Sequence, residues 1–471
     1  MAKYDYFVID IGSTYTKLRL FKDGRLIATA QSPTTIESVY RGISLGKQKL
    51  LSALGEISID AVHTIATSSA AGGLRMVAMG YMVRVTAKAA KEVAMNAGAR
   101  VLEIVSEEDP PEYRIEILKE INPDIILLAG GTDGGDESSI IENANLIVKS
   151  GIKAVVIIAG NINSQAKVAD ILHEGGVPYE RVPNIMPTIH ELRVREAREA
   201  IHREFIRQIT RARGLAPLMQ EITNDKIIPT PGAVLLGAEL LAKGVYEEKG
   251  LGDLAVVDIG GATTDVHSVI PSLEKLENEE KGLIVSNEKQ VSYRTVEGNL
   301  GMRVSALGIV DAVGSRSILK KKNISDKSME EDLTQYAQIL EKKPEHLPQS
   351  EKEEFFDELL AETAIEISLK RHAGFITQEF DPIMGTVPGM PIGRDLRRVK
   401  YLIGVGGFIA HNQSTKAKKV IENAIAKPGY SLLPENPKII LDNNYLLYAA
   451  GAISQIDGEY AFAILKNHFE L

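Results

Sequence analysis

The sequence of 471 residues contains no cysteine. This absence excludes disulfide bonds, thiolate zinc sites and iron–sulfur clusters held by cysteine. Long apolar runs are also missing, since no stretch approaches the roughly 18 consecutive apolar residues of a membrane span. The first residues lead directly into a predicted strand and lack the pattern of a signal peptide. We therefore expect a cytoplasmic protein without a membrane segment.

An excess of basic residues is missing too. The chain has 54 Lys and Arg against 63 Asp and Glu, a formal net charge of −9. General nucleic-acid binders need a basic surface to neutralise phosphates, so we expect no nucleic-acid partner. The Gly-x-x-x-x-Gly-Lys-Ser/Thr loop of P-loop proteins does not occur. The nine histidines are scattered, with none at metal-ligand spacing.

The length predicts two or three domains. Pro229-Thr230-Pro231-Gly232 is a sharp break, and we place the boundary there, giving domains 1–232 and 233–471. Residues 315–372 are highly charged and read as a helical subdomain, followed by Gly- and Pro-rich turns. A C-terminal helix is predicted from about Tyr445, and it can pack back on the first domain.

Two near-copies of one short sequence stand far apart in the chain, at residues 6–17 and 254–265. In each copy an apolar run ends in an aspartate, Asp10 or Asp258, and a glycine turn with hydroxyl side chains follows. Each copy predicts a strand, a turn and a second strand. One such hairpin is usually only structural. Because the same turn recurs 248 positions later, we expect two similar domains that close on one phosphate.

Glycine turns of this kind suit phosphate chemistry. Glycine lets the backbone approach phosphate oxygens, and successive N–H groups in the turn form an anion-binding nest. Asp10 and Asp258 cannot usefully touch phosphate, because both groups are anionic, so they are expected to act through Mg²⁺ or its coordinated water. The predicted phosphate-binding residues are Gly12, Ser13, Thr14, Thr16 and Lys17 in the first turn, and Gly260, Gly261, Thr263 and Thr264 in the second.

A third glycine turn follows a predicted strand at Gly404, Gly406 and Gly407. Such a turn lets a flat ring approach the backbone, and after two phosphate hairpins it fits an adenosine pocket. A tight packing turn between a strand and a helix is an equally good interpretation of this segment alone.

The region between the two hairpins has a different pattern. Residues 124–129 and 154–159 are continuous apolar runs, typical of parallel strands covered on both faces. Residues 86–99 and 188–213 read as helices. Residues 62–85 read as a strand pair around a Ser- and Gly-rich turn that begins at Ser68.

The order of two phosphate hairpins and a Gly-Gly adenosine turn resembles the actin, Hsp70 and sugar-kinase superfamily. The whole chain is similar to the MutL/GlmL family, whose members are encoded with adenosylcobalamin-dependent glutamate mutase and related mutases. The name shared with mismatch-repair MutL is a coincidence. The segments that carry the resemblance, besides the first hairpin, are residues 68–73, 127–135 and 257–265.

The resemblance implies an α/β fold with two actin-like (ribonuclease H-like) domains around an ATP cleft, with a helical subdomain. It implies an ATP-driven reactivase that opens a cobalamin mutase so that damaged cofactor is exchanged. Asp10 and Asp258 would organise Mg²⁺, the two turns would hold the phosphates of ATP, and Gly404, Gly406 and Gly407 would border adenosine. The partners would be the mutase subunits, and a homo-oligomer is left open.

The water-activating residue of this superfamily often follows a later strand of the first domain, where we favour Asp133. The alternative for Asp133 is a solvated loop residue that caps the helix starting near Ser138. A small-molecule kinase of the same fold and a non-catalytic nucleotide-dependent interaction protein remain alternatives for the function. The related activator of 2-hydroxyacyl-CoA dehydratases is excluded, because it bridges a cluster with cysteines.

Overall fold

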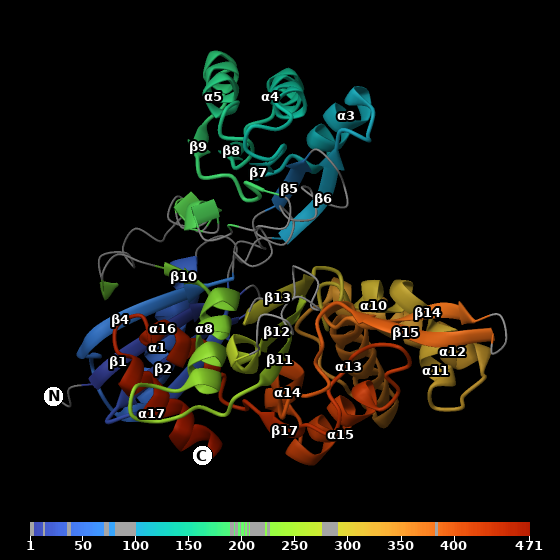
Figure 1. The fold of residues 1–471 in the computed structure, drawn as a ribbon. Helices are drawn as coiled ribbons and strands as arrows, with labels where there is room; N and C mark the ends of the chain where they lie inside the picture. The colour runs from blue at the N-terminus through green and yellow to red at the C-terminus, as the bar shows by residue number, and fades with distance from the viewer. Residues whose placement is uncertain are drawn as a thin grey trace. The chain divides into compact units, whose positions relative to one another are not determined.

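The computed structural model describes residues 4–12, 15–34, 39–69, 75–80, 100–188, 193, 196–197, 199–201, 203–204, 207, 222–223, 227–275, 291–381 and 385–471. The chain forms two compact units (Figure 1). The first unit takes in residues 1–34, 43–67 and 233–471, and the second unit takes in residues 35–42 and 68–232. The division into domains at residue 232 stays a prediction.

The first sheet of the first unit is built around an antiparallel hairpin. Its strands in the first unit follow the order β4-β1-β2-β3. The central strand β1 is buried along almost its whole length, as expected of a strand covered on both faces. Asp-Gly between two apolar runs predicts a two-residue hairpin, and the one between β2 and β3 is confirmed, because Asp23 and Gly24 both have positive φ. The elements are β1 (Tyr4–Ile11), β2 (Tyr15–Lys22), β3 (Arg25–Pro33), α1 (Val39–Leu54) and β4 (Ala61–Ser68).

The second sheet of the first unit repeats this plan. Its order is β13-β12-β11-β16-β17, with β11 antiparallel to β12 and parallel to β16. An antiparallel three-strand meander followed by a strand on its other side is thus present twice. The strands are β11 (Leu254–Ile259), β12 (Thr264–Val269), β13 (Ser292–Glu297), β16 (Tyr401–Gly406) and β17 (Lys438–Leu441).

Helices of the charged region pack on the second sheet, as Figure 1 shows for α13. Two of them begin with side-chain caps, since Asp326 accepts a hydrogen bond from the N–H of Ser328 and Ser350 from that of Glu353. The helices are α10 (Ala306–Val313), α11 (Ser315–Lys320), α12 (Lys327–Lys342) and α13 (Glu351–His372). The predicted α/β class, with a repeated sheet plan and a helical subdomain, is confirmed.

The segment after α13 was expected to contain only Gly- and Pro-rich turns, and this prediction is wrong. It forms an antiparallel two-stranded sheet of β14 (Phe375–Asp381) and β15 (Gly385–Ile392). Pro388 and Pro391 both lie on β15, whose other edge pairs with no strand among the described residues, so the missing N–H of proline is tolerated there.

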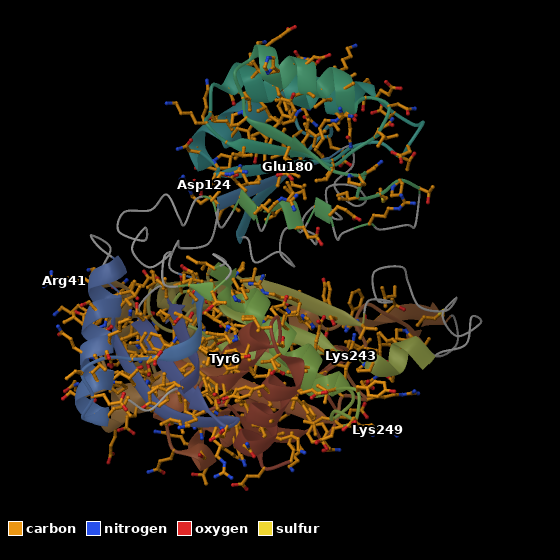
Figure 2. All side chains as sticks on the ribbon, turned by 90° about the vertical axis from the view of Figure 1, so that its left-hand side faces the viewer. Tyr6, Arg41, Asp124, Glu180, Lys243 and Lys249 are labelled. Carbon is orange, nitrogen blue, oxygen red and sulfur yellow. The ribbon has the colours of Figure 1, made fainter. Side chains whose placement is uncertain are left out.

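The C-terminal helices pack against the first sheet. In α17, Tyr460 donates to Asp5 at 2.8 Å, and its ring lies 4.8 Å from that of Tyr6, which Figure 2 labels. Helix α16 crosses α8 at very short range, because a Cβ on Gly237 would lie 2.1 Å from the carbonyl oxygen of Leu447. The remaining elements of the first unit are α8 (Thr230–Lys243), η3 (Pro271–Lys275), α14 (Gly407–His411), α15 (Ser414–Ile425), α16 (Leu446–Ile453) and α17 (Gly458–Phe469).

The second unit is a parallel α/β domain. Its sheet has the order β6-β5-β7-β8-β9, with every pair parallel, and α4 packs between α3 and α5. This is a doubly wound order, with a reversal at β5. The predicted parallel strands at residues 124–129 and 154–159 are confirmed as β7 and β8. The elements are β5 (Arg75–Gly80), β6 (Arg100–Ser106), α3 (Pro111–Ile121), β7 (Ile125–Leu128), α4 (Ser138–Ser150), β8 (Val155–Ile158), α5 (Gln165–Glu174), β9 (Tyr179–Arg181) and β10 (Ile227–Pro229).

The predicted strand pair at residues 62–85 is wrong. β4 belongs to the first sheet, whereas β5 pairs with β6 and β7. The apolar run of β5, buried from Met76 to Gly80, fits the centre of a parallel sheet. The helix predicted at 86–99 and most of the one predicted at 188–213 lie outside the described residues. No helix in the described ranges is long and apolar enough to cross a membrane.

Candidate functional site

The two predicted hairpins have the same local geometry. In both, the N–H of the glycine two places after the aspartate donates across the turn, from Gly12 to the carbonyl of Tyr15 at 3.1 Å and from Gly260 to that of Thr263 at 2.9 Å. In the first hairpin the cross-strand partner of Asp10 is Lys17. In the second, the partner of Asp258 is Asp265. The two hairpins therefore match residue for residue but carry opposite charges beside their aspartates.

Asp10 is a buried and fully engaged carboxylate. Thr67 donates its hydroxyl to Oδ1 at 3.0 Å, and Lys17 donates its ammonium to Oδ2 at 3.1 Å. The Asp10 side chain is only 2% exposed, against 19% for Lys17. The negative charge on Asp10 is therefore matched within the protein, and the carboxylate is held in one orientation.

Asp258, unlike Asp10, has no such partners among the described residues. It is partly buried, and among the described residues its carboxylate has no hydrogen bond or ion pair. Burial, and after it the negative charge of Asp265, raise the pKa of Asp258 to about 7, although Lys17 opposes the shift. Asp10 and Asp442 add to the negative field. A half-buried carboxylate that lacks a partner in such surroundings favours an added cation or a proton.

The neighbouring carboxylate Asp265 does have partners. The guanidinium of Arg294 holds its Oδ1, with Nε at 2.9 Å, and Thr263 donates to its Oδ2 at 3.0 Å. Arg294 and Asp265 are both buried, at 3% and 6% exposure. Asp265 is therefore part of a buried ion pair behind the turn, which leaves Asp258 as the open carboxylate of this hairpin.

The third glycine turn meets the second hairpin through the pairing of β16 with β11. Gly406 has φ of 117°, and a Cβ there would lie 2.1 Å from the carbonyl oxygen of Ile259, so only glycine fits. Gly407 begins α14 beside the hydroxyl of Tyr445. Gly404 is surrounded by apolar core side chains, and a Cβ there would meet Ile421 first. Gly406 and Gly407 are therefore better placed than Gly404 to face a ligand.

Two residues that the sequence did not single out also belong to the site. Tyr445 has positive φ, and its ring lies under the ammonium of Lys17, 4.7 Å from the ring centre. Asp442 is fully buried, accepts the backbone N–H groups of Leu446 and Leu447 at 2.8 Å each, and so caps α16. A signal for Asp442 exists in the sequence, since it ends an apolar run, as Asp10 and Asp258 do, although no glycine turn follows it.

The predicted hydroxyl donors of the turns divide into two groups. Thr16 and Thr264 are fully buried. Thr16 hydrogen-bonds Thr34 at 3.0 Å, and Thr264 donates to the carbonyl of Leu300 at 2.5 Å, so both hydroxyls serve the fold. Ser13 and Thr14 lie outside the described residues.

The second turn is braced from behind by residues 300–304. The carbonyl of Gly260 accepts the N–H of Met302 at 2.9 Å, and that of Gly261 accepts the N–H groups of Arg303 and Val304 at 2.8 Å each. With its carbonyls engaged in this way, the turn has a fixed backbone, which suits it to present N–H groups to an anion.

Asp133 lies in the second unit, in the loop after β7. Its Oδ1 accepts the N–H of Ile162 at 3.0 Å and the amide of Asn184 at 2.9 Å. The alternative role as the cap of the following helix is filled by Asp136, whose oxygens accept the N–H groups of Ser138 and Ser139. The role of Asp133 as a water-activating residue stays a prediction.

The residues present fit Mg²⁺ in the manner in which it binds nucleotides. The described residues contain no cluster of three or more His, Asp or Glu side chains able to cage a metal. Mg²⁺ seldom needs one, because it keeps several waters and takes one or two carboxylates plus substrate phosphates. Asp258, which has no partner of its own among the described residues, is the suitable direct ligand. Asp10, already bonded to Lys17 and Thr67, suits a water-mediated contact.

Comparisons with known proteins agree with the sequence resemblance. The family model described as MutL protein matches residues 6–469. Protein MutL of Clostridium tetanomorphum is 37% identical over 471 residues, covering 98% of both chains.

Among solved structures, the nucleotide-free diol dehydratase-reactivating factor has a TM-score of 0.34 at 10% identity, covering 99% of this chain and 100% of that one. Component A of (R)-2-hydroxyglutaryl-CoA dehydratase from Acidaminococcus fermentans has a TM-score of 0.32 at 11% identity, covering 99% of both chains. Scores of this size support no inference, so the assignment rests on the sequence matches. The chain belongs to the MutL protein family.

Proposed function

We propose that this protein is an ATP-dependent accessory protein that reactivates an adenosylcobalamin-dependent mutase of the glutamate mutase type. ATP binding and hydrolysis would drive the exchange of damaged cobalamin on the partner. The observation that carries the proposal is a pair of turns with the same strand register, each following a strand that carries an aspartate near its end. The two aspartates are close enough for the charge of Asp10 to raise the pKa of Asp258.

The arrangement of charge supports a nucleotide with a bound cation. The positive charge of Lys17 favours the ionised form of Asp258, while Asp10, Asp265 and Asp442 all disfavour it. When bound, Mg²⁺ would neutralise charge on the phosphates and on Asp258 together. Lys17 would then be available to donate to a phosphate oxygen from its position over the ring of Tyr445.

The remaining assignments follow from the positions of the turns. The other N–H groups of the two turns would hold phosphate oxygens, because those of Gly12 and Gly260 donate across the turns. Gly406 and Gly407 would border adenosine, because that turn adjoins the end of β11 through the pairing of Ile259 with Gly406. In phosphoryl transfer, positioning and charge neutralisation contribute more than a strong base, so the proposal does not depend on Asp133.

Steady-state hydrolysis tests the proposal directly. The purified protein should hydrolyse ATP slowly with Mg²⁺ and without a small acceptor. Asp10→Asn and Asp258→Asn should each lower the rate by about 100-fold, a loss typical of removing one preorganised electrostatic group. Asp395→Asn serves as a control, because that side chain is exposed and pairs only locally with Arg397.

The reactivation itself needs a second assay. A mutase inactivated with hydroxocobalamin should regain activity when the protein, ATP and intact adenosylcobalamin are added, and Asp258→Asn should not restore it. Failure to bind ATP would refute the site. Phosphate transfer that appears only with an added sugar or carboxylic acid would favour the small-molecule kinase. ATP binding without hydrolysis or reactivation would favour the non-catalytic interaction protein.

A further inference from the structure

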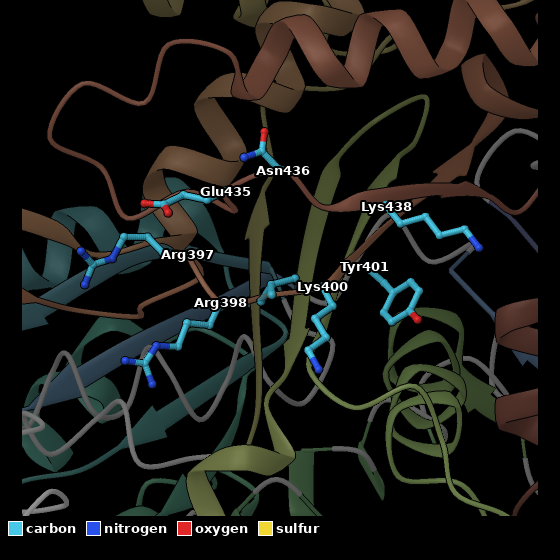
Figure 3. A pocket seen from close by; sticks show the side chains of 8 residues that line it. Arg397, Arg398, Lys400, Tyr401, Glu435, Asn436 and Lys438 are labelled. Carbon is cyan, nitrogen blue, oxygen red and sulfur yellow. The ribbon is translucent and has the colours of Figure 1, made fainter.

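A basic hollow lies at the start of β16 and β17, in a chain whose net charge is negative. It encloses about 600 Å³ and is lined by Arg397, Arg398, Val399, Lys400, Tyr401, Glu435, Asn436 and Lys438. Figure 3 shows these side chains, with Arg397, Arg398 and Glu435 on the left, Tyr401 and Lys438 on the right, and Lys400 between them. Four cationic side chains and one carboxylate thus line the hollow.

Three of the four cations lack a partner in the described part of the chain. Arg398, Lys400 and Lys438 are exposed and form no side-chain hydrogen bond or ion pair there. Arg397 is different, because its guanidinium holds Asp395 at 2.7 Å. Packing does not require three cations without a hydrogen-bonded partner around one hollow, and their charges favour an anionic occupant.

An exposed apolar face adjoins the hollow. Phe375 and Ile392 are cross-strand partners of the β14–β15 sheet, so their side chains lie on one face, and Met390 lies beside them where the register of the pairing shifts. Phe375, Ile392 and Met390 are 53%, 39% and 59% exposed, and the nearby Tyr430 is 52% exposed. We call this the apolar face.

Backbone pairing joins the apolar face to the basic hollow. Residues 396–400 run beside residues 432–438, with bonds from Leu396 N–H to Leu432 O at 3.0 Å and from Lys438 N–H to Lys400 O at 2.8 Å. Just before this stretch, Ile376 of β14 donates its N–H to the carbonyl of Tyr430 at 2.8 Å. The two features are therefore linked through the backbone, and we call them together the docking surface. It is apolar at the hairpin and cationic at the start of the strands.

We propose that this surface binds an acidic segment of a partner protein, with apolar side chains on the hairpin and carboxylates in the hollow. An open hollow that holds several flexible cations suits a protein carboxylate cluster better than a small ligand, which prefers an enclosed and mostly apolar pocket. Arg398 can bind carboxylate bidentately, while Lys400 and Lys438 supply point charges. This inference rests on the proposed function only for the identity of the partner, which would be the mutase.

A single strand, β16, connects the same surface to the candidate nucleotide site. Tyr401, in the hollow, begins β16, and Gly406, at the third glycine turn, ends it. The separation along the strand is roughly 17 Å at about 3.3 Å per residue. Arg394, just before the hollow, donates to the hydroxyl of Ser268 on β12 at 2.9 Å. Partner binding at the hollow can therefore act on the second hairpin through two rigid connections.

The test uses the full chain and two probes. One is a fluorescein-labelled peptide of alternating Glu and Leu, and the other is the purified glutamate mutase-type enzyme. The variant Arg398→Glu/Lys400→Glu/Lys438→Glu should weaken binding of both probes at least tenfold. The control Lys327→Glu/Lys342→Glu/Lys343→Glu makes the same charge change at the two ends of α12 and should bind as the wild type does. ATP hydrolysis without partner should be equal in all three proteins.

The outcomes separate the surface from the function. If the wild type binds the peptide, the hollow variant does not, and no mutase binds, the docking surface is supported and the proposed partner is rejected. Equal peptide binding by the wild type and the hollow variant would overturn the surface. The surface would also be overturned if millimolar inorganic phosphate displaced the peptide and neither Phe375→Ser nor Met390→Ser changed the peptide affinity. The hollow would then be a site for a small anion.

Discussion

The two hairpins of the first unit share a register and differ in their chemistry. At the first, Lys17 stands opposite the aspartate and neutralises it. At the second, the same position is Asp265, which is turned to Arg294 and leaves Asp258 without a partner among the described residues. The comparison teaches that the duplicated fold does not imply duplicated roles. We infer that one aspartate is fixed by the protein and that the other is reserved for a cation.

The difference extends into the core behind the hairpins. The strand position of Leu20 in the first corresponds to Ser268 in the second. Ser268 belongs to a buried polar network, in which His372 bonds Ser268 and Thr295 at 2.8 Å each. At this point the first hairpin carries a buried apolar side chain, whereas the second contacts a histidine, whose charge depends on pH.

The largest expected effect comes from breaking the buried pair that exists only at the second hairpin. Asp265→Asn removes the carboxylate that neutralises the buried guanidinium of Arg294, so the free energy of unfolding should fall by about 3–5 kcal/mol. Chemical denaturation followed by circular dichroism measures the change. Glu422→Gln removes the exposed partner of Lys419 and should change stability by less than about 1 kcal/mol. Equal effects of the two variants would contradict the buried pair.

A smaller effect is expected from the cation that exists only at the first hairpin. Lys17→Met removes the positive charge that acts on both aspartates, so ATP affinity should fall about tenfold, or about 1.4 kcal/mol. Lys22→Met, at the other end of the same strand, is the matched control and should bind ATP as the wild type does. Isothermal titration calorimetry gives both affinities. A Lys17→Met protein with unchanged affinity would remove Lys17 from the site.

The smallest effect concerns the polar network behind the second hairpin. Burial holds the pKa of His372 well below its usual range, and the charge of Arg394 lowers it further. The unfolded chain therefore takes up a proton below about pH 6.5 that the folded chain refuses, so stability is lost as the pH falls below that value. His372 should contribute roughly 1 kcal/mol per pH unit to this loss.

The pH dependence of the free energy of unfolding can be compared between a variant of His372 and a control variant of an exposed histidine. His372→Gln should flatten the dependence of the free energy of unfolding on pH between about 6.5 and 5. His411→Gln, at an exposed position, should leave the slope unchanged. If His372→Gln keeps the slope of the wild type, the network does not titrate as described.

The sequence predicted the features that are local. Both hairpins, the Asp23-Gly24 turn and the apolar strands β7 and β8 follow from patterns within about ten residues. The separate environments of Asp10 and Asp258 depend on Thr67 and Arg294, which lie far away in the chain. No local pattern identifies such partners, because folding rather than spacing brings them together.

Other features needed the pairing of strands to be known. β4 and β5 each read as a strand, but only the sheets show that they do not pair. Thr16 and Thr264 were predicted to hold phosphate from their place in the turns, and their burial appears only when the neighbouring segments are packed. Tyr445 carries no motif, and it enters the site because α16 packs beside the first sheet.

The central claim is that Asp258 is kept without a protein partner so that it can take a cation with the nucleotide. The most direct test is calorimetric titration of ATP with and without Mg²⁺ on the wild type and on Asp258→Asn. We predict that Mg²⁺ raises the ATP affinity of the wild type by at least about tenfold and leaves that of Asp258→Asn nearly unchanged. The same gain from Mg²⁺ in both proteins would contradict the claim.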